Sequence, residues 1–173
     1  MIKVEWNECP GERDWIEVKK RALRTIGKNV VTAPDLEWKK RMLGCRHSPI
    51  RRLFFSFYIE CPYWVSVHLC RHIHSQPYVL SQRNDRQDKY DRGKAPQDQT
   101  VSMIWDMNAE ELMIIANKRL CKQASAETRE VVKMMCELVK EKLPEFAGVL
   151  VPNCVYHGGV CHEMFPCGGV KND

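Results

Sequence analysis

Two arginines lie on the apolar faces of two expected helices, where a charged group needs a chemical reason. Each one is at helical spacing from apolar residues: Trp64 and Val67 precede Arg71, and Leu112 and Ile115 precede Arg119. A buried guanidinium needs an anionic partner, because its desolvation is otherwise costly. Its planar fork matches a phosphate, a carboxylate or the paired carbonyls of a base. The spacing therefore indicates an anion or base site.

The two arginines can also have purely structural roles at the same spacing. Each side chain can extend along the helix to solvent, or pair with a carboxylate such as Glu127. Arg119 can also compensate the negative end of its own helix dipole. The pattern alone leaves these alternatives open.

The Cys- and His-rich tail is the other cluster that could do chemistry. Cys154, His157, Cys161 and Cys167 lie within 14 residues, and Cys121 is placed to approach them from the end of a helix. Zinc takes four nitrogen or sulfur ligands in a tetrahedron. We therefore treat the four tail residues as candidate zinc ligands. Their spacing matches no standard zinc finger, so reduced thiols packed under a Gly-rich tail are the alternative.

The elements that must position these residues follow from periodicity and stop signals. Strands are expected at 2–7, 51–60 and 100–107, and helices at 11–26, 35–43, 62–72, 108–122 and 125–142. Asn108 with Glu111, and Ser125, carry signals for the start of a helix. Residues 81–99 form a polar loop, either solvated or ordered by a ligand. The pattern predicts an α+β fold, with a mainly antiparallel sheet flanked by helices.

Composition excludes several classes of protein. The chain has 173 residues, of which 44% are hydrophobic and 28% are charged, which suits one compact domain rather than a disordered segment. No apolar run is long enough to span a membrane, and the start lacks a signal-peptide pattern. We therefore expect a cytoplasmic protein whose nine cysteines are reduced.

Positive charge is concentrated in one part of the chain. Residues 11–52 hold 12 Lys and Arg against 5 Asp and Glu, which fits an anionic ligand. A nucleic-acid-binding module is the alternative that this charge and the Arg-rich loop at 83–94 suggest. We disfavour that alternative because the aromatic residues that stack on single strands are not interleaved with the basic ones.

The segment that follows the first of these arginines resembles a known signature. Arg71-His72, then eight residues, then Ser81-x-Arg83 resembles the Arg-His-Arg, seven residues, Ser-x-Arg pattern of the flavin-dependent thymidylate synthases. Other elements of that family follow in the same order over residues 46–130. They are the aromatic stretch 49–62, Arg92 with Pro96, Trp105, Asn108-Ala109, Leu112-Met113, Arg119, Ala124 and Glu127.

The departures from the family pattern are concentrated in its flavin contacts. Ile73 replaces the third residue of Arg-His-Arg, Glu110 replaces an Arg, and Ile114 replaces an Asn. Arg52, Tyr78-Val79 and a short 84–91 segment also differ from the family. The retained residues belong mostly to the nucleotide contacts, so the resemblance implies a compact, divergent member.

The resemblance implies an enzyme that converts dUMP to dTMP. Methylenetetrahydrofolate would donate the carbon, reduced FAD the hydride, and NADPH would regenerate the flavin. The nucleotide would be bound by Arg71, Ser81, Arg83, Arg92 and Arg119, with Arg119 also activating the base. His72 and Asn108 would contact FAD. Residues 1–150 would be the catalytic domain, 151–173 a separate tail, and the enzyme a homotetramer with shared sites.

A different activity on the same scaffold is the main alternative. The altered flavin positions suggest a pyrimidine-nucleotide-binding protein, or a transferase of another one-carbon group such as hydroxymethyl, with altered or lost flavin use.

Overall fold

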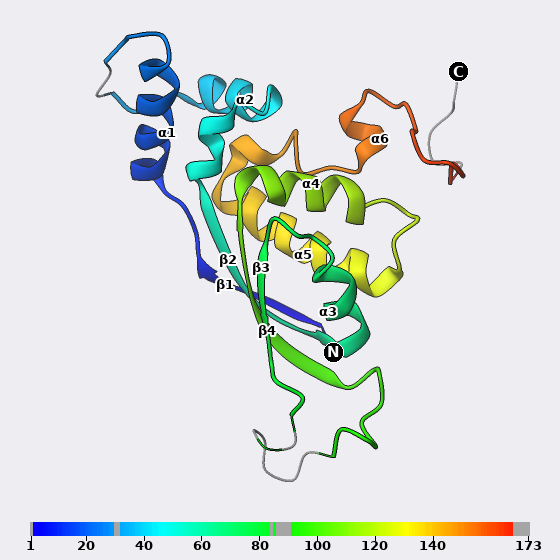
Figure 1. The fold of residues 1–173 in the computed structure, drawn as a ribbon. Coiled ribbons are helices and arrows are strands. Elements are labelled where there is room, and N and C mark those ends of the chain that lie inside the picture. The colour runs from blue at the N-terminus through cyan, green and yellow to red at the C-terminus, as the bar shows by residue number, and fades with distance from the viewer. Residues whose placement is uncertain (1, 30–31, 84, 86–90, 168–173) are drawn as a thin grey trace.

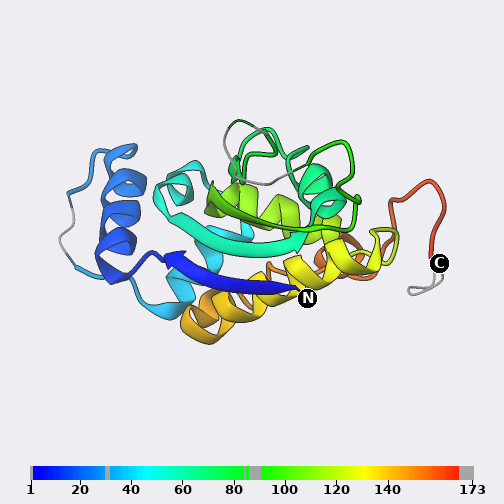
Figure 2. The ribbon, with the colours of Figure 1, turned by 90° about the horizontal axis from the view of Figure 1, so that it is seen from below.

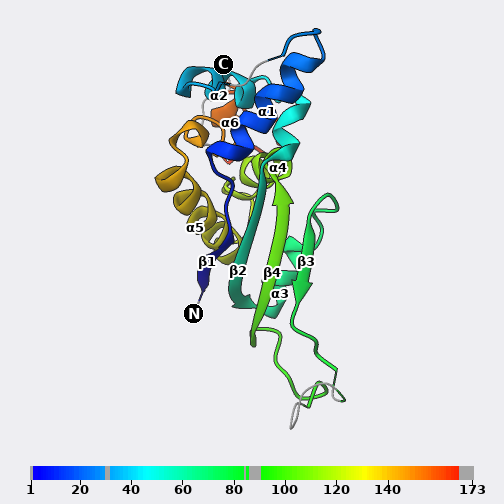
Figure 3. The same ribbon diagram turned by 90° about the vertical axis from the view of Figure 1, so that its left-hand side faces the viewer.

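A four-stranded antiparallel sheet is the centre of the structure. The computed structural model describes residues 2–29, 32–83, 85 and 91–167. The strands are β1 (Lys3–Glu8), β2 (Phe54–Pro62), β3 (Gln76–Val79) and β4 (Thr100–Asn108), in the spatial order β1-β2-β4-β3 (Figures 1 and 3). All three pairings are antiparallel. The predicted α+β class is confirmed.

One face of the sheet forms the core. Pairs such as Phe57 with Trp105 and Phe55 with Met107 lie opposite each other on β2 and β4, and all four side chains are buried. Helices α3 (Tyr63–Leu69), α4 (Ala109–Arg119) and α5 (Ala126–Lys142) lie on the same side of the sheet (Figure 1). Alternation along the strands therefore separates this apolar face from the face that carries Tyr58 and Asp106.

The helix-start signals act as predicted. The Asn108 side chain accepts a hydrogen bond from the backbone N–H of Glu111, and Ser125 accepts one from Thr128. These caps satisfy donors that the first turn of a helix leaves without a partner. The cap at Asn108 follows β4 directly, so α4 begins where the strand ends.

Helix α1 and the tail lie at opposite ends of the molecule. Helix α1 (Glu12–Arg24) is at one end and the tail at the other (Figure 2). Helix α2 (Leu36–Gly44) contacts the tail helix α6 (Asn153–Tyr156), because the Tyr156 hydroxyl donates to the backbone carbonyl of Gly44 at 3.0 Å. The short 3-10 helices are η1 (Ser48–Arg52) and η2 (Pro144–Phe146). Within the described ranges, no helix combines the length and the apolar character needed to cross a bilayer.

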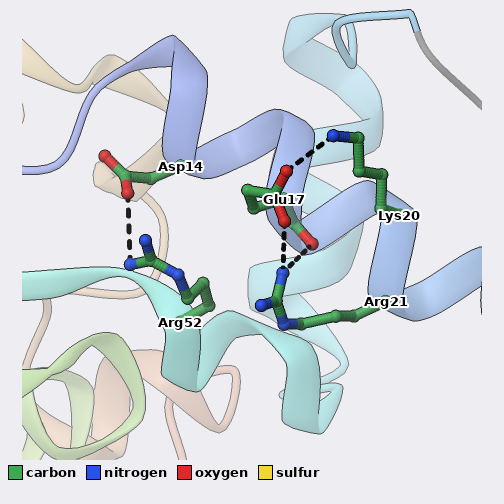
Figure 4. A network of polar contacts seen from close by, with 5 residues as sticks. All are labelled: Asp14, Glu17, Lys20, Arg21 and Arg52. Carbon is green, nitrogen blue, oxygen red and sulfur yellow. Dashed lines mark hydrogen bonds and ion pairs between the residues drawn. The ribbon is translucent and has the colours of Figure 1, made fainter.

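Local ion pairs neutralise part of the basic N-terminal region. Glu17 pairs with Lys20 at 2.6 Å and Arg21 at 2.7 Å, and Arg52 of η1 pairs with Asp14 of α1 at 3.2 Å (Figure 4). Lys20, Arg21 and Arg52, which are three of the 12 Lys and Arg residues over 11–52, therefore have carboxylate partners within the same region.

The structure corrects two of the expected elements and adds one strand. The strand predicted at 51–60 begins at Phe54, because Pro49 lies in the 3-10 turn that precedes it. The helix predicted at 62–72 ends at Leu69, so Arg71 is not on it. Strand β3 was not predicted. It has four residues and lies at the sheet edge, too short for a clear alternation.

Candidate functional site

Three side chains from two separate elements form a chain of polar contacts on the helical side of the sheet. Arg119, the last residue of α4, donates from Nε to Nε2 of His72 at 2.9 Å and from Nη2 to the backbone carbonyl of His68 at 3.3 Å. On the other side of the imidazole, Nδ1 of His72 lies 3.5 Å from Oε1 of Glu111. Both the His72 and the Glu111 side chains are more than nine-tenths buried.

A buried anchor holds the turn that carries His72. The Ser75 hydroxyl donates to the backbone carbonyl of His72 at 2.6 Å, and Trp105 Nε1 on β4 donates to that hydroxyl at 2.7 Å. The Ser75 backbone N–H donates to the same carbonyl at 3.1 Å. Strand β4 therefore positions His72 through Ser75, and it positions Glu111 through the cap at Asn108.

Arg71 completes the charge pattern of this site. It lies two residues beyond the end of α3 and is exposed, so the predicted apolar stripe through Arg71 is wrong. Arg71 nevertheless lies close enough to Arg119 to influence the pKa of its guanidinium. Burial, and then the positive charge of Arg71, lower the pKa of the Arg119 guanidinium from its ordinary value. Two neighbouring cations favour an anion placed near both of them.

Of the structural roles considered for Arg119, the structure supports compensation of the helix dipole but not the pairing with Glu127. Arg119 does lie in the last turn of α4, where a cation compensates the helix dipole. The suggested pairing with Glu127 is replaced by contacts with His72 and the His68 carbonyl. Its partners in the structure are therefore hydrogen-bond acceptors without a full charge, which leaves the guanidinium charge available to a ligand.

The other predicted nucleotide contacts lie on a different part of the chain. Ser81, Arg83 and Arg92 are exposed in the segment between β3 and β4. Arg83 forms a bidentate salt bridge with Asp85. This segment projects from the end of the sheet away from α4 (Figures 1 and 3). One chain thus brings Arg71 and Arg119 together, but it holds Arg83 and Arg92 apart from them.

A polar pocket of about 550 Å³ adjoins the Glu111 end of the contact chain. Its lining contains three of the positions that depart from the family pattern, Ile73, Glu110 and Ile114, together with the retained Asn108. The lining residues are Arg51, Ile73, His74, Gln76, Asn108, Glu110, Glu111 and Ile114. This volume is within the range of pockets that hold a small organic ligand.

The residues that line this pocket do not supply the cations that the pyrophosphate of a dinucleotide needs. Arg51 forms an ion pair with Glu110, so a carboxylate already balances this guanidinium. Ile73, where the family has an Arg, is 79% exposed. The pocket fits a planar ring by size, whereas the pyrophosphate of a dinucleotide needs cations from beyond the lining residues.

The cysteines of the tail gather around a second, small pocket. Cys121, Cys154, Cys161 and Cys167 line it together with His162 and Glu163. Cys121 thus approaches the tail as expected, while His157 is not among the lining residues and instead packs edge-on against Tyr156 and His162. Across residues 2–167, as far as they are described, no three His, Cys, Asp or Glu side chains are arranged to hold a metal ion.

Sequence reasoning recognised Glu111 only as part of a helix start. The structure shows that its carboxylate contacts His72. A signal was present in the sequence, because Glu111 lies four residues before Ile115 and eight before Arg119, and so on nearly the same side of the helix. His68 and Ser75 contribute a backbone carbonyl and a hydroxyl, for which the sequence carries no comparable signal.

Known proteins resemble this chain in sequence and in fold. The family model of the thymidylate synthase complementing protein matches residues 90–145. Among solved structures, the UMP/dUMP methylase PolB from Streptomyces cacaoi bound with 5-Br dUMP has a TM-score of 0.68 at 15% identity, covering 87% of this chain and 97% of that chain. The same enzyme bound with 5-Br UMP has a TM-score of 0.64 at 15% identity, covering 87% and 96%. No curated protein matches the sequence.

Proposed function

We propose that the chain is a compact, divergent member of the flavin-dependent thymidylate synthase family and a nucleotide methyltransferase that converts dUMP to dTMP. The observation that carries the proposal is the pair of neighbouring cations, Arg71 and Arg119, beside the buried Glu111–His72 contact. The matched segment 90–145 contains Arg119, and two solved structures of the same fold hold bromo derivatives of dUMP and UMP.

Arg119 is the proposed catalytic residue. Methylation at C5 of uracil needs negative charge to develop on the ring, and a permanent cation at the carbonyl edge stabilises that charge. A guanidinium remains protonated at working pH even with its pKa lowered by burial. Two of its five N–H groups are used by His72 and the His68 carbonyl, so three remain for the carbonyl edge of the base.

The phosphate of the nucleotide requires more than one chain. We propose that Ser81, Arg83 and Arg92 of one copy bind the phosphate of a nucleotide whose base lies at Arg71 and Arg119 of another. The support is the position of residues 80–83 and 91–99, which extend away from α4 and are mostly exposed. A homotetramer with shared sites, as the family resemblance implies, satisfies this requirement.

The carbon and the reducing equivalents come from cosubstrates. Methylenetetrahydrofolate would supply the carbon, and reduced FAD, regenerated by NADPH, would supply the hydride. Asn108 lines the pocket that a planar ring fits. Both nitrogens of His72 are engaged by Arg119 and Glu111, so His72 can offer the flavin only the face of its ring.

The altered pocket favours a second candidate function. Glu110 and Ile73 stand where the family has cations, and Glu110 also balances the charge of Arg51. A transferase of another one-carbon group, such as hydroxymethyl, would add the carbon without needing the hydride that makes a methyl group. A pyrimidine-nucleotide-binding protein without transfer would need neither cosubstrate.

Product analysis separates these candidates. The purified protein is incubated with dUMP, methylenetetrahydrofolate, FAD and NADPH, and the nucleotides are identified by mass spectrometry. We expect dTMP, and we expect none when FAD or NADPH is omitted. Hydroxymethyl-dUMP formed without flavin would support the second transferase, and binding of dUMP without any product would support the binding protein.

Matched variants assign any activity to the site. Arg119→Ala removes the proposed catalytic cation, whereas Lys118→Ala removes the neighbouring cation, which is exposed and pairs with Glu163. We expect the first variant to lose product formation and the second to keep it. Equal activity in both would remove the role assigned to Arg119.

A further inference from the structure

We propose that Glu111 is a positioning residue that fixes the tautomer of His72 and thereby holds Arg119 in place for the nucleotide. The role in nucleotide binding rests on the proposed function, whereas the tautomer itself follows from the contacts within the chain. Glu111 touches neither reacting group in this scheme and acts through the imidazole.

The hydrogen bond between Arg119 and His72 determines which imidazole nitrogen carries the proton. Nε of a guanidinium is always a donor, so Nε2 of His72, at 2.9 Å, must be the acceptor and must be unprotonated. A neutral imidazole then carries its proton on Nδ1. This nitrogen faces Oε1 of Glu111 at 3.5 Å, so the carboxylate stabilises the Nδ1–H form.

The alternative tautomer would disrupt the site. With the proton on Nε2, two donors would face each other between His72 and Arg119, and the lone pair on Nδ1 would face a carboxylate. Each of these contacts is repulsive in a buried environment. A carboxylate behind a histidine is a general way to fix the orientation and tautomer of a ring whose other nitrogen binds something.

The position of Glu111 explains how a buried carboxylate is tolerated there. Only 3% of the residue is exposed, and it is the third residue of α4, where the positive end of the helix dipole favours an anion. Its backbone N–H is bonded to Asn108, so the first turn of the helix is capped by the asparagine. The carboxylate is therefore available for His72, and α4 holds Glu111 and Arg119 at its two ends.

Nitrogen NMR of isotope-labelled histidine tests the tautomer directly. In the wild-type protein we expect His72 to show a protonated Nδ1 and an unprotonated Nε2. Glu111→Ala should shift His72 toward a mixture of the two tautomers, whereas Glu111→Gln, whose amide oxygen can accept a hydrogen bond from Nδ1–H, should retain the wild-type form. Glu145→Gln is the matched control, because Glu145 is also buried but lies beside Lys39.

Binding of dUMP by the same variants tests the consequence for Arg119. We expect Glu111→Ala to weaken binding about tenfold, the range seen when a residue behind a functional group is removed. Glu111→Gln should bind nearly as well as the wild type, which a purely electrostatic role would not allow. If Glu111→Ala does not fold, Glu111→Gln and the wild-type spectrum still decide the assignment.

Two results would overturn the inference. One is a wild-type His72 that carries a proton on Nε2. The other is a Glu111→Ala variant with an unchanged tautomer and unchanged dUMP affinity. A wild-type protein that binds no pyrimidine nucleotide, but whose His72 tautomer depends on Glu111, would instead contradict the proposed function and leave the tautomer assignment standing.

Discussion

Nε of Arg119 lies 2.9 Å from Nε2 of His72, and this contact joins the end of α4 to the turn that follows α3. The guanidinium is thus held by a neutral acceptor, and its charge is not cancelled by a carboxylate in direct contact. This arrangement suits a cation that must act on a ligand, because a salt bridge would have to be broken before the ligand could bind.

Substitution of the guanidinium by an ammonium separates charge from geometry. Arg119→Lys keeps the positive charge but lacks the planar fork that reaches both His72 and a base. We expect kcat for dTMP formation to fall by about 10²–10³-fold, the range for loss of one preorganised donor. The reciprocal change on the adjacent exposed residue, Lys118→Arg, should leave kcat unchanged. Wild-type kcat in Arg119→Lys would show that charge alone suffices.

The anchor beneath His72 contributes to stability. Trp105→Phe keeps most of the buried ring but removes the indole N–H that donates to the Ser75 hydroxyl. We expect the free energy of unfolding to fall by about 1–2 kcal/mol, because a buried hydrogen bond is lost and the cavity of the missing ring is partly empty. Urea unfolding measures the change, and Trp64→Phe, on a partly buried residue of α3, is the control. An unchanged urea midpoint in Trp105→Phe would contradict the anchor.

The ion pairs around Glu17 predict a pH dependence of stability. Hydrogen bonds from Lys20 and then Arg21 lower the pKa of the Glu17 carboxyl from 4.5 to about 2 (Figure 4). A carboxyl with a lowered pKa stabilises the folded state above its unfolded pKa, and this contribution is lost as pH falls through the folded pKa. The Tm of the wild type should therefore exceed that of Glu17→Gln at neutral pH.

This Tm difference should be small and should shrink between pH 4.5 and about 2. The side chains are exposed, so added salt should reduce the difference as well. A Tm difference that stays constant across this pH range would show that the ion pairs do not cause it.

The cysteines of the tail predict a low zinc content. Cys121, Cys154, Cys161 and Cys167 line one pocket and His157 does not, but within the described residues no three His, Cys, Asp or Glu side chains are arranged to hold a metal ion. A structural zinc site needs four such ligands in a tetrahedron. We predict a zinc content under about 0.2 per chain in untagged protein and a Tm that chelation does not change. Zinc near about one per chain, with a lower Tm after chelation, would contradict this prediction.

Local signals predicted most of the fold. The caps at Asn108 and Ser125 and the aromatic run of β2 each act through neighbours in the sequence, so periodicity and residue type identified them. Strand β3 was not predicted, because an edge strand of four residues depends on its pairing with β4 rather than on its own sequence pattern. The end of α3 at Leu69 was not predicted, because the sequence continues with helical spacing to Arg71.

The sequence predicted individual residues of the candidate site but not the contacts between them. Arg119 and His72 were identified by their motifs, but the contact between them joins two elements that are distant in the sequence. Arg83 and Arg92 share a segment that the sheet directs away from Arg119. In the proposed function these arginines meet across two copies of the chain, and no spacing within one chain encodes such a contact.

Complementation between two inactive variants tests the shared nucleotide site most directly. Arg83→Ala and Arg119→Ala chains carrying different tags are produced together, and mixed oligomers that hold both tags are isolated and assayed for dTMP. The account predicts that each variant alone is inactive and that the mixed oligomers regain activity, because some sites then contain both intact arginines. Mixed oligomers as inactive as either variant alone, or an Arg83→Ala protein with full activity, would contradict it.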